Sequence, residues 1–521
     1  MPQSPMLSSN IKTVVMLMLE NRSLDNLFGH LYKDRDQVHY WPPGSPKRYD
    51  GIPANAQLPA INWDGNLEMY PIVPVPVKKL RAKGNDPSII PWWDPTEEYL
   101  SFFDTGHGVV NQLFGDQYRV SKLPPYGTAP GMSGFLQDYW TWYTDPAYGG
   151  MDITWTFPEE LLPNMHAAAK AGAISDAWFS SVPTDTNPNR AFSLLGTSLG
   201  RERNAHITSV EKFNSYTLFQ GLAKKKKKCG LYYTDIWHDH QCFTAYTFPQ
   251  AKRGLHEVGT VDTFLARAAA GTLPDFSYVE PKWGYGVSGS IMMTQGTDLH
   301  PPTSVTPGDQ FVGAFLQALS KSKQWPNMLV LILFDEHGGT YDHAKPAWGA
   351  INPDGRRGKL GFKFDLFGVR VPAILISPYV RSRTVFRAPL ESKYPFDHTS
   401  VIRTLMSWAG GDASAFLKRA QAAPSFEGVL LASDEEAADN ASVIQKTLSA
   451  LPPADAKPRE MGNALFDGLA FASVRAILAT STSAEEVVRK IERYRRDPVA
   501  FEKRVAKGGL STNIDSTSAA T

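Results

Sequence analysis

The 521-residue sequence has few cysteines, almost no net charge and no long apolar segment. The two cysteines, Cys229 and Cys242, are too few to stabilise a chain of this size by disulfides, and they do not form a metal-ligand pattern. A single disulfide between them is an open alternative. With 53 Lys and Arg against 52 Asp and Glu, the chain has no overall field that would attract nucleic acid or an anionic membrane. Hydrophobic residues still make up 42%, which excludes disorder for most of the chain and predicts a large core.

The apolar runs are too short to cross a membrane, because a spanning helix needs about 20 consecutive apolar residues. The first ten residues also lack the basic and apolar regions of a secretory signal peptide. We therefore expect a cytoplasmic protein from the sequence as written, with export by another route as the alternative.

Three continuous apolar runs predict buried strands of a largely parallel sheet: Val14–Leu19, Met328–Phe334 and Ala373–Ile376. Each run is followed by polar or turn residues: Glu20-Asn21, Asp335-Glu336 and Ser377-Pro378. Ligands of open α/β sheets bind beyond the carboxyl ends of the strands. The sequence therefore predicts an α/β fold in which the two acidic pairs meet in one site.

Helical and loop-rich segments indicate the domain organisation. Apolar residues at helical spacing predict a helix over Gln310–Ser320 and another that begins with Asp397 as its N-cap. Residues 31–150 are rich in proline and glycine clusters, which predicts a loop-rich cap insertion over the carboxyl edge of the sheet. We expect one large domain over residues 11–420, a helical extension over 421–510 and a disordered tail over 511–521.

The two acidic pairs are candidates for binding a cation. Glu20 and Asn21 offer the oxygen ligands that divalent cations prefer, although a strand end followed by a helix cap is the alternative. Asp335-Glu336 opens the segment DEHGGTYDH, in which Gly338 and Gly339 allow the backbone to turn sharply against a ligand. This dense polar cluster favours a site over a plain strand end.

The segment Ser180–Arg190 is the candidate for a nucleophile. It lies between a strand-like run and a helix-like run, and hydroxyls in such a turn are exposed and close to backbone N–H groups. The candidate hydroxyls are those of Ser180, Ser181, Thr184 and Thr186. Helix capping is the alternative role of a hydroxyl in this position.

Loop histidines and a lysine run are further candidates. His107, His238 and His300 lie near prolines, glycines and acids, where an imidazole can protonate a leaving oxygen or bind phosphate. Simple exposure of a loop histidine is the alternative. The run Lys224–Lys228 fits contact with anionic lipid head groups, and a solvated helix end explains it without any partner.

Several motifs occur together in one order: ENRSLDNLFG (20–29), DTGHGVVNQLFGD (104–116), SVPTDTNPNR (181–190), DLHPP (298–302), DEHGGTYDH (335–343), RVPAILISP (370–378) and DHTS (397–400). In these motifs the chain resembles the phosphoesterase family of plant non-specific and bacterial phosphatidylcholine-type phospholipases C and related acid phosphatases. The resemblance implies an alkaline-phosphatase-like α/β sandwich and makes residues 11–420 a phosphoesterase catalytic domain.

The resemblance also implies the roles of individual residues. Thr186 matches the family nucleophile, which forms a covalent phosphothreonine intermediate, and His107 and His300 match histidines around the phosphate. His238 matches only the acid-phosphatase branch, and the roles of His343 and His398 stay open. The positions that match the binding site for one divalent metal ion are Glu20, Asn21, Thr186, Asp335 and Glu336. Asn21 is also expected to act in catalysis, by donating a hydrogen bond to a phosphate oxygen.

The activity that this resemblance implies is metal-dependent phosphoester hydrolysis, with a phospholipase C favoured. The alternatives are an acid phosphatase with a broad phosphomonoester range, a non-catalytic lipid- or phosphate-binding module, and a delivered effector. The expected partner is a phospholipid or a small phosphomonoester, with peripheral membrane contact and without nucleic acid. The identity of the metal and the oligomeric state stay open.

Overall fold

The computed structural model describes residues 10–451, with the exception of 34–35, 63, 93, 101–107, 116–117, 119–121, 143–149, 205–211, 236–240, 285–295, 359–360 and 431–433. The described residues belong to one compact unit, residues 1–284 and 295–455. The predicted tail 511–521 and most of the predicted helical extension 421–510 lie outside the described residues. None of the described helices is long and apolar enough to cross a membrane.

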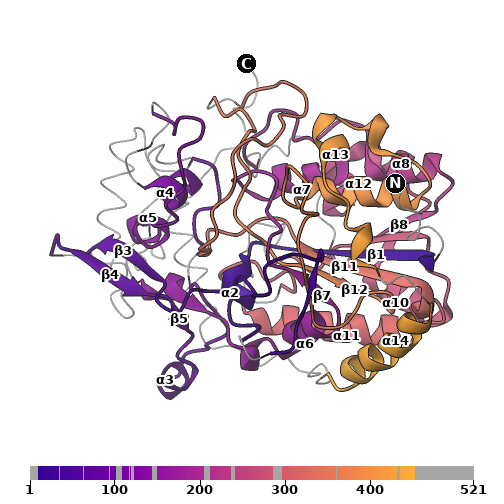
Figure 1. Ribbon diagram of the computed structural model, residues 1–521, viewed down its shortest axis with the longest axis horizontal. Helices are drawn as coiled ribbons and strands as arrows, with labels where there is room; N and C mark the ends of the chain where they lie inside the picture. Colours follow the sequence, from indigo (N-terminus) through magenta and orange to yellow (C-terminus); the bar gives the residue numbers. More distant parts are fainter. Residues whose placement is uncertain are drawn as a thin grey trace, which may run out of the picture. The chain divides into compact units, whose positions relative to one another are not determined.

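A nine-stranded sheet lies at the centre of the described fold (Figure 1). In spatial order its strands are β2 (His39–Trp41), β13 (Thr384–Phe386), β7 (Ala173–Ser175), β12 (Ala373–Ile376), β11 (Met328–Phe334), β1 (Thr13–Leu19), β10 (Phe276–Val279), β8 (Cys229–Tyr233) and β9 (Glu257–Thr260). Neighbouring strands are parallel except where β12 pairs with β7 and β11. The predicted mostly parallel α/β sheet is confirmed, as are the three predicted strands.

The direction of β12 corrects one expectation. Because β12 runs antiparallel to both of its neighbours, its carboxyl end and the following Ser377-Pro378 lie at the edge opposite to the carboxyl ends of β1 and β11. Its amino end, preceded by Arg370, lies at the same edge as the two acidic pairs. A buried run of apolar residues does not encode the direction of its strand.

Helices cover both faces of the sheet (Figure 1). One layer contains α6 (Pro163–Ala171), α10 (Val261–Ala270), α11 (Val305–Ser320) and α14 (Asp434–Ser449). The other layer contains α7 (Thr186–Leu195), α8 (Leu218–Lys224), α12 (Thr399–Trp408) and α13 (Lys418–Ala422). The predicted helix at Gln310–Ser320 is the second part of α11. The residue at the N-cap of α12 is His398, although the Asp397 carboxylate does accept a hydrogen bond from the Thr399 amide.

Residues 31–150 contain more regular structure than the predicted loop-rich insertion. Besides β2, they form the hairpin β3 (Gln57–Ile61) and β4 (Leu67–Pro71), the strand β5 (Val73–Pro74), which pairs with β6 (Trp155–Thr156), and the helices α3 (Val77–Ala82), α4 (Val109–Phe114) and α5 (Phe135–Trp142). Elsewhere lie the short helices α2 (Leu24–Phe28) and α9 (Phe243–Thr247).

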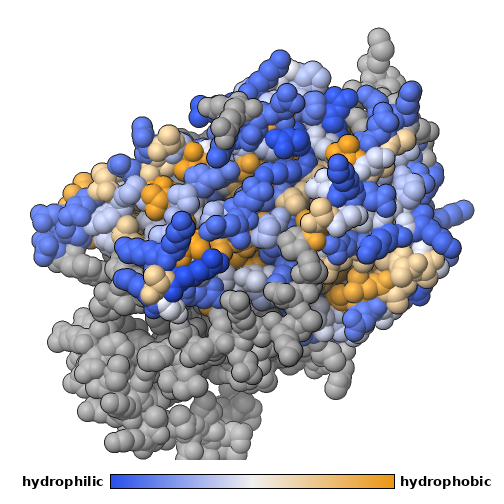
Figure 2. Space-filling view, turned by 90° about the horizontal axis from the view of Figure 1, so that it is seen from below, coloured by the Kyte–Doolittle hydropathy of each residue, from blue (hydrophilic) through white to orange (hydrophobic). Residues whose placement is uncertain are grey.

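The face of the molecule in Figure 2 shows small groups of hydrophobic residues among hydrophilic ones.

Both cysteines are buried and free. The alternative of a disulfide between Cys229 and Cys242 is therefore wrong, and the apolar core that contains both residues stabilises this part of the fold without a covalent link.

Candidate active site

The carboxyl ends of β1 and β11 bring the two acidic pairs together. The strands are parallel neighbours with Leu19 opposite Phe334, so the residues that follow them leave the sheet side by side. The Asn21 amide donates a hydrogen bond of 3.1 Å to Asp335 Oδ1. Glu20, Asn21, Asp335 and Glu336 are all buried. The structure therefore places these predicted site residues in one cluster, as their positions after the two strands led us to expect.

Arg190 of α7 joins the two pairs. Its guanidinium lies 2.7 Å from Glu20 Oε1 and 2.9 Å from Asp335 Oδ2, and it stacks over the ring of Trp283. Burial alone would lower the pKa of Arg190, but the Asp335 and Glu20 carboxylates raise it above its usual value. Arg190 therefore stays charged and compensates part of the buried negative charge. Arg190 was not predicted as a site residue, although it lies one helical turn after Thr186 and therefore on the same face of α7.

Thr186 is the first residue of α7, and its hydroxyl donates a 3.4 Å hydrogen bond to Asn21 Oδ1. The other three candidate hydroxyls are used differently. Ser181 donates to Asp397, Thr184 to the carbonyl of Glu202, and Ser180 to the carbonyl of Val182. Of the four hydroxyls, only that of Thr186 is aimed at the acidic cluster. It also lies at a helix N-terminus, where the helix dipole favours a negative group.

The predicted sharp turn at Gly338 and Gly339 is present, and both glycines have positive φ. A Cβ at Gly338 would lie 2.1 Å from the Asn21 carbonyl oxygen, and one at Gly339 would lie 2.6 Å from Thr96 O. The chain that follows β11 turns at these two positions between residues 20–21 and residues 95–97, and only glycine has room there.

Glu97, from the 31–150 insertion, reaches the same cluster. Its Oε2 accepts a hydrogen bond from Asn21 Nδ2 and lies 3.7 Å from His300 Nε2. Glu97 was not predicted as a site residue, because it lies in an irregular segment, and no strand or helix directly before it indicates where its side chain would point.

The structure describes one of the three predicted loop histidines. His300 Nε2 lies 4.0 Å from Glu20 Oε2, and Nδ1 lies 2.6 Å from the Pro301 carbonyl oxygen. Burial lowers the pKa of His300 to about 4, so its ring is neutral at pH 7. Because a carbonyl can only accept, Nδ1 carries the hydrogen and the lone pair of Nε2 faces the carboxylates. His107 and His238 lie outside the described residues.

The charges of the cluster fit a divalent cation. Burial raises the pKa of Glu20 and of Glu336, and Asp335 raises both further. Burial and the Glu336 carboxylate also raise the pKa of Glu97. Glu336 Oε1 is buried without a hydrogen-bond partner among the described residues. A hard cation would satisfy this oxygen and relieve the repulsion. Three side chains, those of Asp94, Glu97 and His300, also lie close enough to one another to share a cation.

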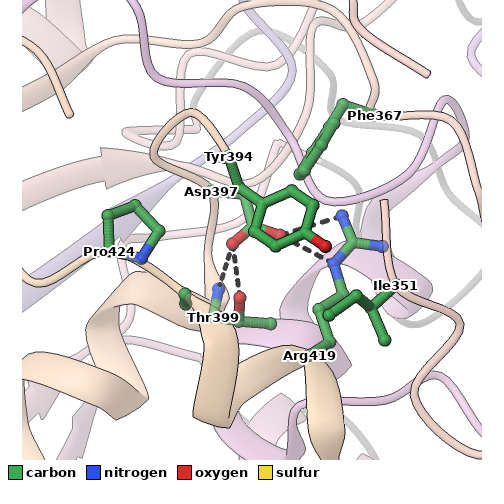
Figure 3. A pocket seen from close by; sticks show the side chains of 8 residues that line it. Ile351, Phe367, Tyr394, Asp397, Thr399, Arg419 and Pro424 are labelled. Carbon is green, nitrogen blue, oxygen red and sulfur yellow. Dashed lines mark hydrogen bonds and ion pairs between the residues drawn. The ribbon is translucent and has the colours of Figure 1, made fainter. Parts of the chain in front are cut away.

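A second buried network supports the nucleophile turn, residues 180–186, named for its four candidate hydroxyls. Asp397 and Arg419 both line the small cavity in Figure 3 and form a direct ion pair, with 2.9 Å between Oδ2 and Nη2. The Ser181 hydroxyl donates to Asp397, and Arg419 donates to the Ser181 carbonyl. None of the residues that line this cavity is a candidate site residue, so the network holds the turn before Thr186 without taking part in the site.

The histidines at 343 and 398 have structural partners. His398 Nε2 contacts the Asp335 carbonyl oxygen and holds the backbone of the acidic pair. His343 Nδ1 lies 2.6 Å from Asp25 Oδ2, and Arg370 pairs with Asp25 and with Asp342. The second half of DEHGGTYDH therefore forms an ion network that anchors the first half.

We expect the contribution of His343 to stability to depend on pH. Burial opposes its charged form, but hydrogen bonds to Asp25 and Asp50 raise its pKa to about 10, against about 6.5 in an unfolded chain. A raised folded-state pKa stabilises the protein fully below pH 6.5, and this contribution is lost as the pH rises through 10. His343→Gln should therefore lower the free energy of unfolding by a few kcal/mol at pH 6, and by much less at pH 10. Urea unfolding at both pH values checks this, and an equal loss at both would contradict it.

Comparison with known proteins establishes the class of the chain. The model of the Phosphoesterase family matches residues 11–409, so the chain belongs to this family and is a phosphoric ester hydrolase. It is 32% identical to non-specific phospholipase C3 of Arabidopsis thaliana over 76% of this chain and 69% of the relative. It is 23% identical to the hemolytic phospholipase C of Pseudomonas aeruginosa over 76% of this chain and 52% of the relative.

Solved structures similar to the chain include a protein in the alkaline phosphatase superfamily from Vibrio parahaemolyticus, with 14% identity over 56% of this chain and 80% of that chain and a TM-score of 0.30. Another is the lipoteichoic acid synthase LtaP from Listeria monocytogenes, with 11% identity over 57% of this chain and 88% of that chain and a TM-score of 0.29. The fold class of this chain follows from its own sheet topology.

Proposed function

We propose that the chain is a metal-dependent phospholipase C that cleaves phospholipids through a covalent intermediate on Thr186. The observation that carries this proposal is the Thr186 hydroxyl, which lies at the N-terminus of α7 and 3.4 Å from Asn21 Oδ1, beside the buried carboxylates of the sheet edge. Membership of the Phosphoesterase family and the phospholipase C names of several relatives support a phospholipid substrate.

The residues that would hold the cation are Glu20, Asn21, Thr186, Asp335 and Glu336. Bound there, a divalent ion lowers the pKa of a coordinated hydroxyl and offsets negative charge on the transferred phosphoryl group. Arg190 keeps Glu20 and Asp335 in place through its two ion pairs.

The reaction has two displacements at phosphorus. In the first, the Thr186 hydroxyl gives up its proton to water as Oγ bonds to phosphorus, and the bond to the glycerol oxygen breaks. The glycerol oxygen takes up a proton from water, so diacylglycerol leaves and the phosphorylated head group stays on Thr186. In the second, water loses a proton as its oxygen bonds to phosphorus, and the bond to Thr186 Oγ breaks. Thr186 Oγ takes up a proton, which restores the hydroxyl, and the phosphorylated head group leaves. The lone pair of His300 Nε2 faces this edge, and we assign it to take the proton of the attacking water. The sequence predicted that a loop histidine could protonate the leaving oxygen. A neutral His300 ring has no hydrogen on Nε2 to donate, so we do not assign that role to it.

We expect a chelator to remove the activity. Phosphatidylcholine vesicles and a chromogenic phosphomonoester are each incubated with the enzyme, with and without EDTA, and then with Mg²⁺, Mn²⁺ or Ca²⁺ restored. The expected result is release of diacylglycerol and phosphocholine that EDTA abolishes and one of the cations restores.

Three results would contradict the proposal in different ways. Full activity in EDTA would contradict the dependence on a metal. Hydrolysis of the phosphomonoester alone would identify an acid phosphatase. Failure to hydrolyse either substrate with metals present would favour a binding module.

A further inference from the structure

The side chain of Asn21 lies between Thr186 and Glu97. Its backbone has a φ of 55°, a conformation that asparagine tolerates better than most residues. The two ends of the amide differ, because Oδ1 accepts hydrogen bonds and Nδ2 donates them. Oδ1 accepts from the Thr186 hydroxyl, and Nδ2 donates to Glu97 Oε2. Rotating the amide by half a turn would place two acceptor oxygens, Asn21 Oδ1 and Glu97 Oε2, against each other, and would turn Nδ2 instead of Oδ1 toward the Thr186 hydroxyl.

Glu97 is held firmly enough to fix this orientation. Gln112 Nε2 donates a 2.6 Å hydrogen bond to the Thr96 carbonyl oxygen, immediately before Glu97. Two residues later, the Tyr99 amide donates to Thr184 Oγ1 in the nucleophile turn. The backbone at Gly339 also packs closely against the segment, since a Cβ there would lie 2.6 Å from Thr96 O. The segment therefore has contacts to α4, to the nucleophile turn and to the turn after β11.

We propose that Glu97 is a positioning residue for the reaction of Thr186. By accepting the hydrogen bond from Asn21 Nδ2, it keeps Asn21 Oδ1 toward the Thr186 hydroxyl and available as an oxygen ligand. The proposal rests on the proposed function, in which Thr186 is the nucleophile. It gives the 31–150 insertion a role in the chemistry, because a residue of the insertion sets the orientation of a residue that follows β1.

Two substitutions separate the hydrogen bond from the charge. Glu97→Gln keeps an acceptor of nearly the same shape, whereas Glu97→Leu removes it. Because partners that orient a ligand typically contribute about 10–100-fold, we expect Glu97→Leu to lower kcat by roughly that factor. We expect KM to change little and Glu97→Gln to stay within about threefold of the unchanged enzyme. Glu159→Leu is the matched control, because Glu159 lies on the surface with an ion pair to Lys170.

Binding of Mn²⁺, measured by electron paramagnetic resonance in the absence of substrate, gives a readout that does not depend on turnover. We expect Glu97→Leu to weaken Mn²⁺ binding about 10-fold, and to weaken it no further when Asn21 is already alanine. Thermal unfolding of each variant checks that the protein is folded. Glu97→Ala, which adds no bulk, replaces the leucine variant if that variant does not fold.

Several outcomes would overturn the role of Glu97. These are full activity of Glu97→Leu, equal losses in Glu97→Gln and Glu97→Leu, or additive losses of Mn²⁺ binding in the Asn21→Ala background. If Thr186→Ala is inactive while Glu97→Leu is fully active, only the role of Glu97 fails. If Thr186→Ala is active, the proposed function fails.

Discussion

Replacing Thr186 with alanine should lower kcat by roughly 10⁴-fold or more, because the substitution removes the nucleophile of the first displacement. The fold should stay intact. The Thr186 hydroxyl donates one weak hydrogen bond, of 3.4 Å, to Asn21 Oδ1, so its loss should change the free energy of unfolding little. Thr186→Ser keeps the hydroxyl and should retain measurable turnover. Activity on phosphatidylcholine and the midpoint of thermal unfolding are measured for both variants.

Thr184 provides the control from the same turn. Its hydroxyl is buried and donates to the Glu202 carbonyl, so Thr184→Ala should cost about 1–3 kcal/mol of unfolding free energy. At a temperature where the variant is folded, its kcat should fall far less than that of Thr186→Ala, because Thr184 acts on the site only through the Tyr99 hydrogen bond that supports the Glu97 segment. Retained activity in Thr186→Ala, or an equal loss of kcat in Thr184→Ala, would place the nucleophile elsewhere.

Replacing Arg190 with methionine should have the largest effect on stability. Arg190 is fully buried and pairs with two buried carboxylates, those of Glu20 and Asp335. Removing it leaves two buried negative charges facing each other, and loss of one partner of a buried ion pair typically costs about 3–5 kcal/mol. Urea unfolding at pH 7 with EDTA present measures this loss without a contribution from bound metal.

Arg267→Met is the matched control for this substitution. Arg267 also lies 2.7 Å from a carboxylate, that of Glu257, but 40% of its side chain is exposed. Exposed ion pairs contribute about 0–1 kcal/mol, so this substitution should change the unfolding free energy little. Equal losses in the two variants would show that burial of the Arg190 pairs does not decide the stability of the site.

The central strands and the meeting of the acidic pairs could be predicted from the sequence. Parallel strands buried on both faces appear as continuous apolar runs, so β1, β11 and β12 were visible within one residue of their bounds. The position of Glu20 and Asp335 directly after two such runs then implied that they share one edge of the sheet. The direction of β12 could not be predicted, because parallel and antiparallel buried strands have the same apolar pattern.

Other parts of the site depend on contacts that no local pattern encodes. Glu97 comes from an irregular segment whose position is set by Gln112, Thr184 and Gly339, all distant in sequence. The choice among the hydroxyls of the 180–186 turn also needed the structure, because each of the four could cap a helix. The edge strand β2 has only three residues, too few to show an alternating pattern.

Trapping the intermediate is the most direct test of the proposed mechanism. The enzyme is mixed with phosphatidylcholine, quenched in acid within the first turnovers, digested and analysed by mass spectrometry. The proposed mechanism predicts a phosphocholine group on the peptide that contains Thr186, and a phosphate on the same residue when a phosphomonoester is used. A covalent group on any other residue, or turnover with no adduct on Thr186 under conditions that accumulate the intermediate, would contradict it.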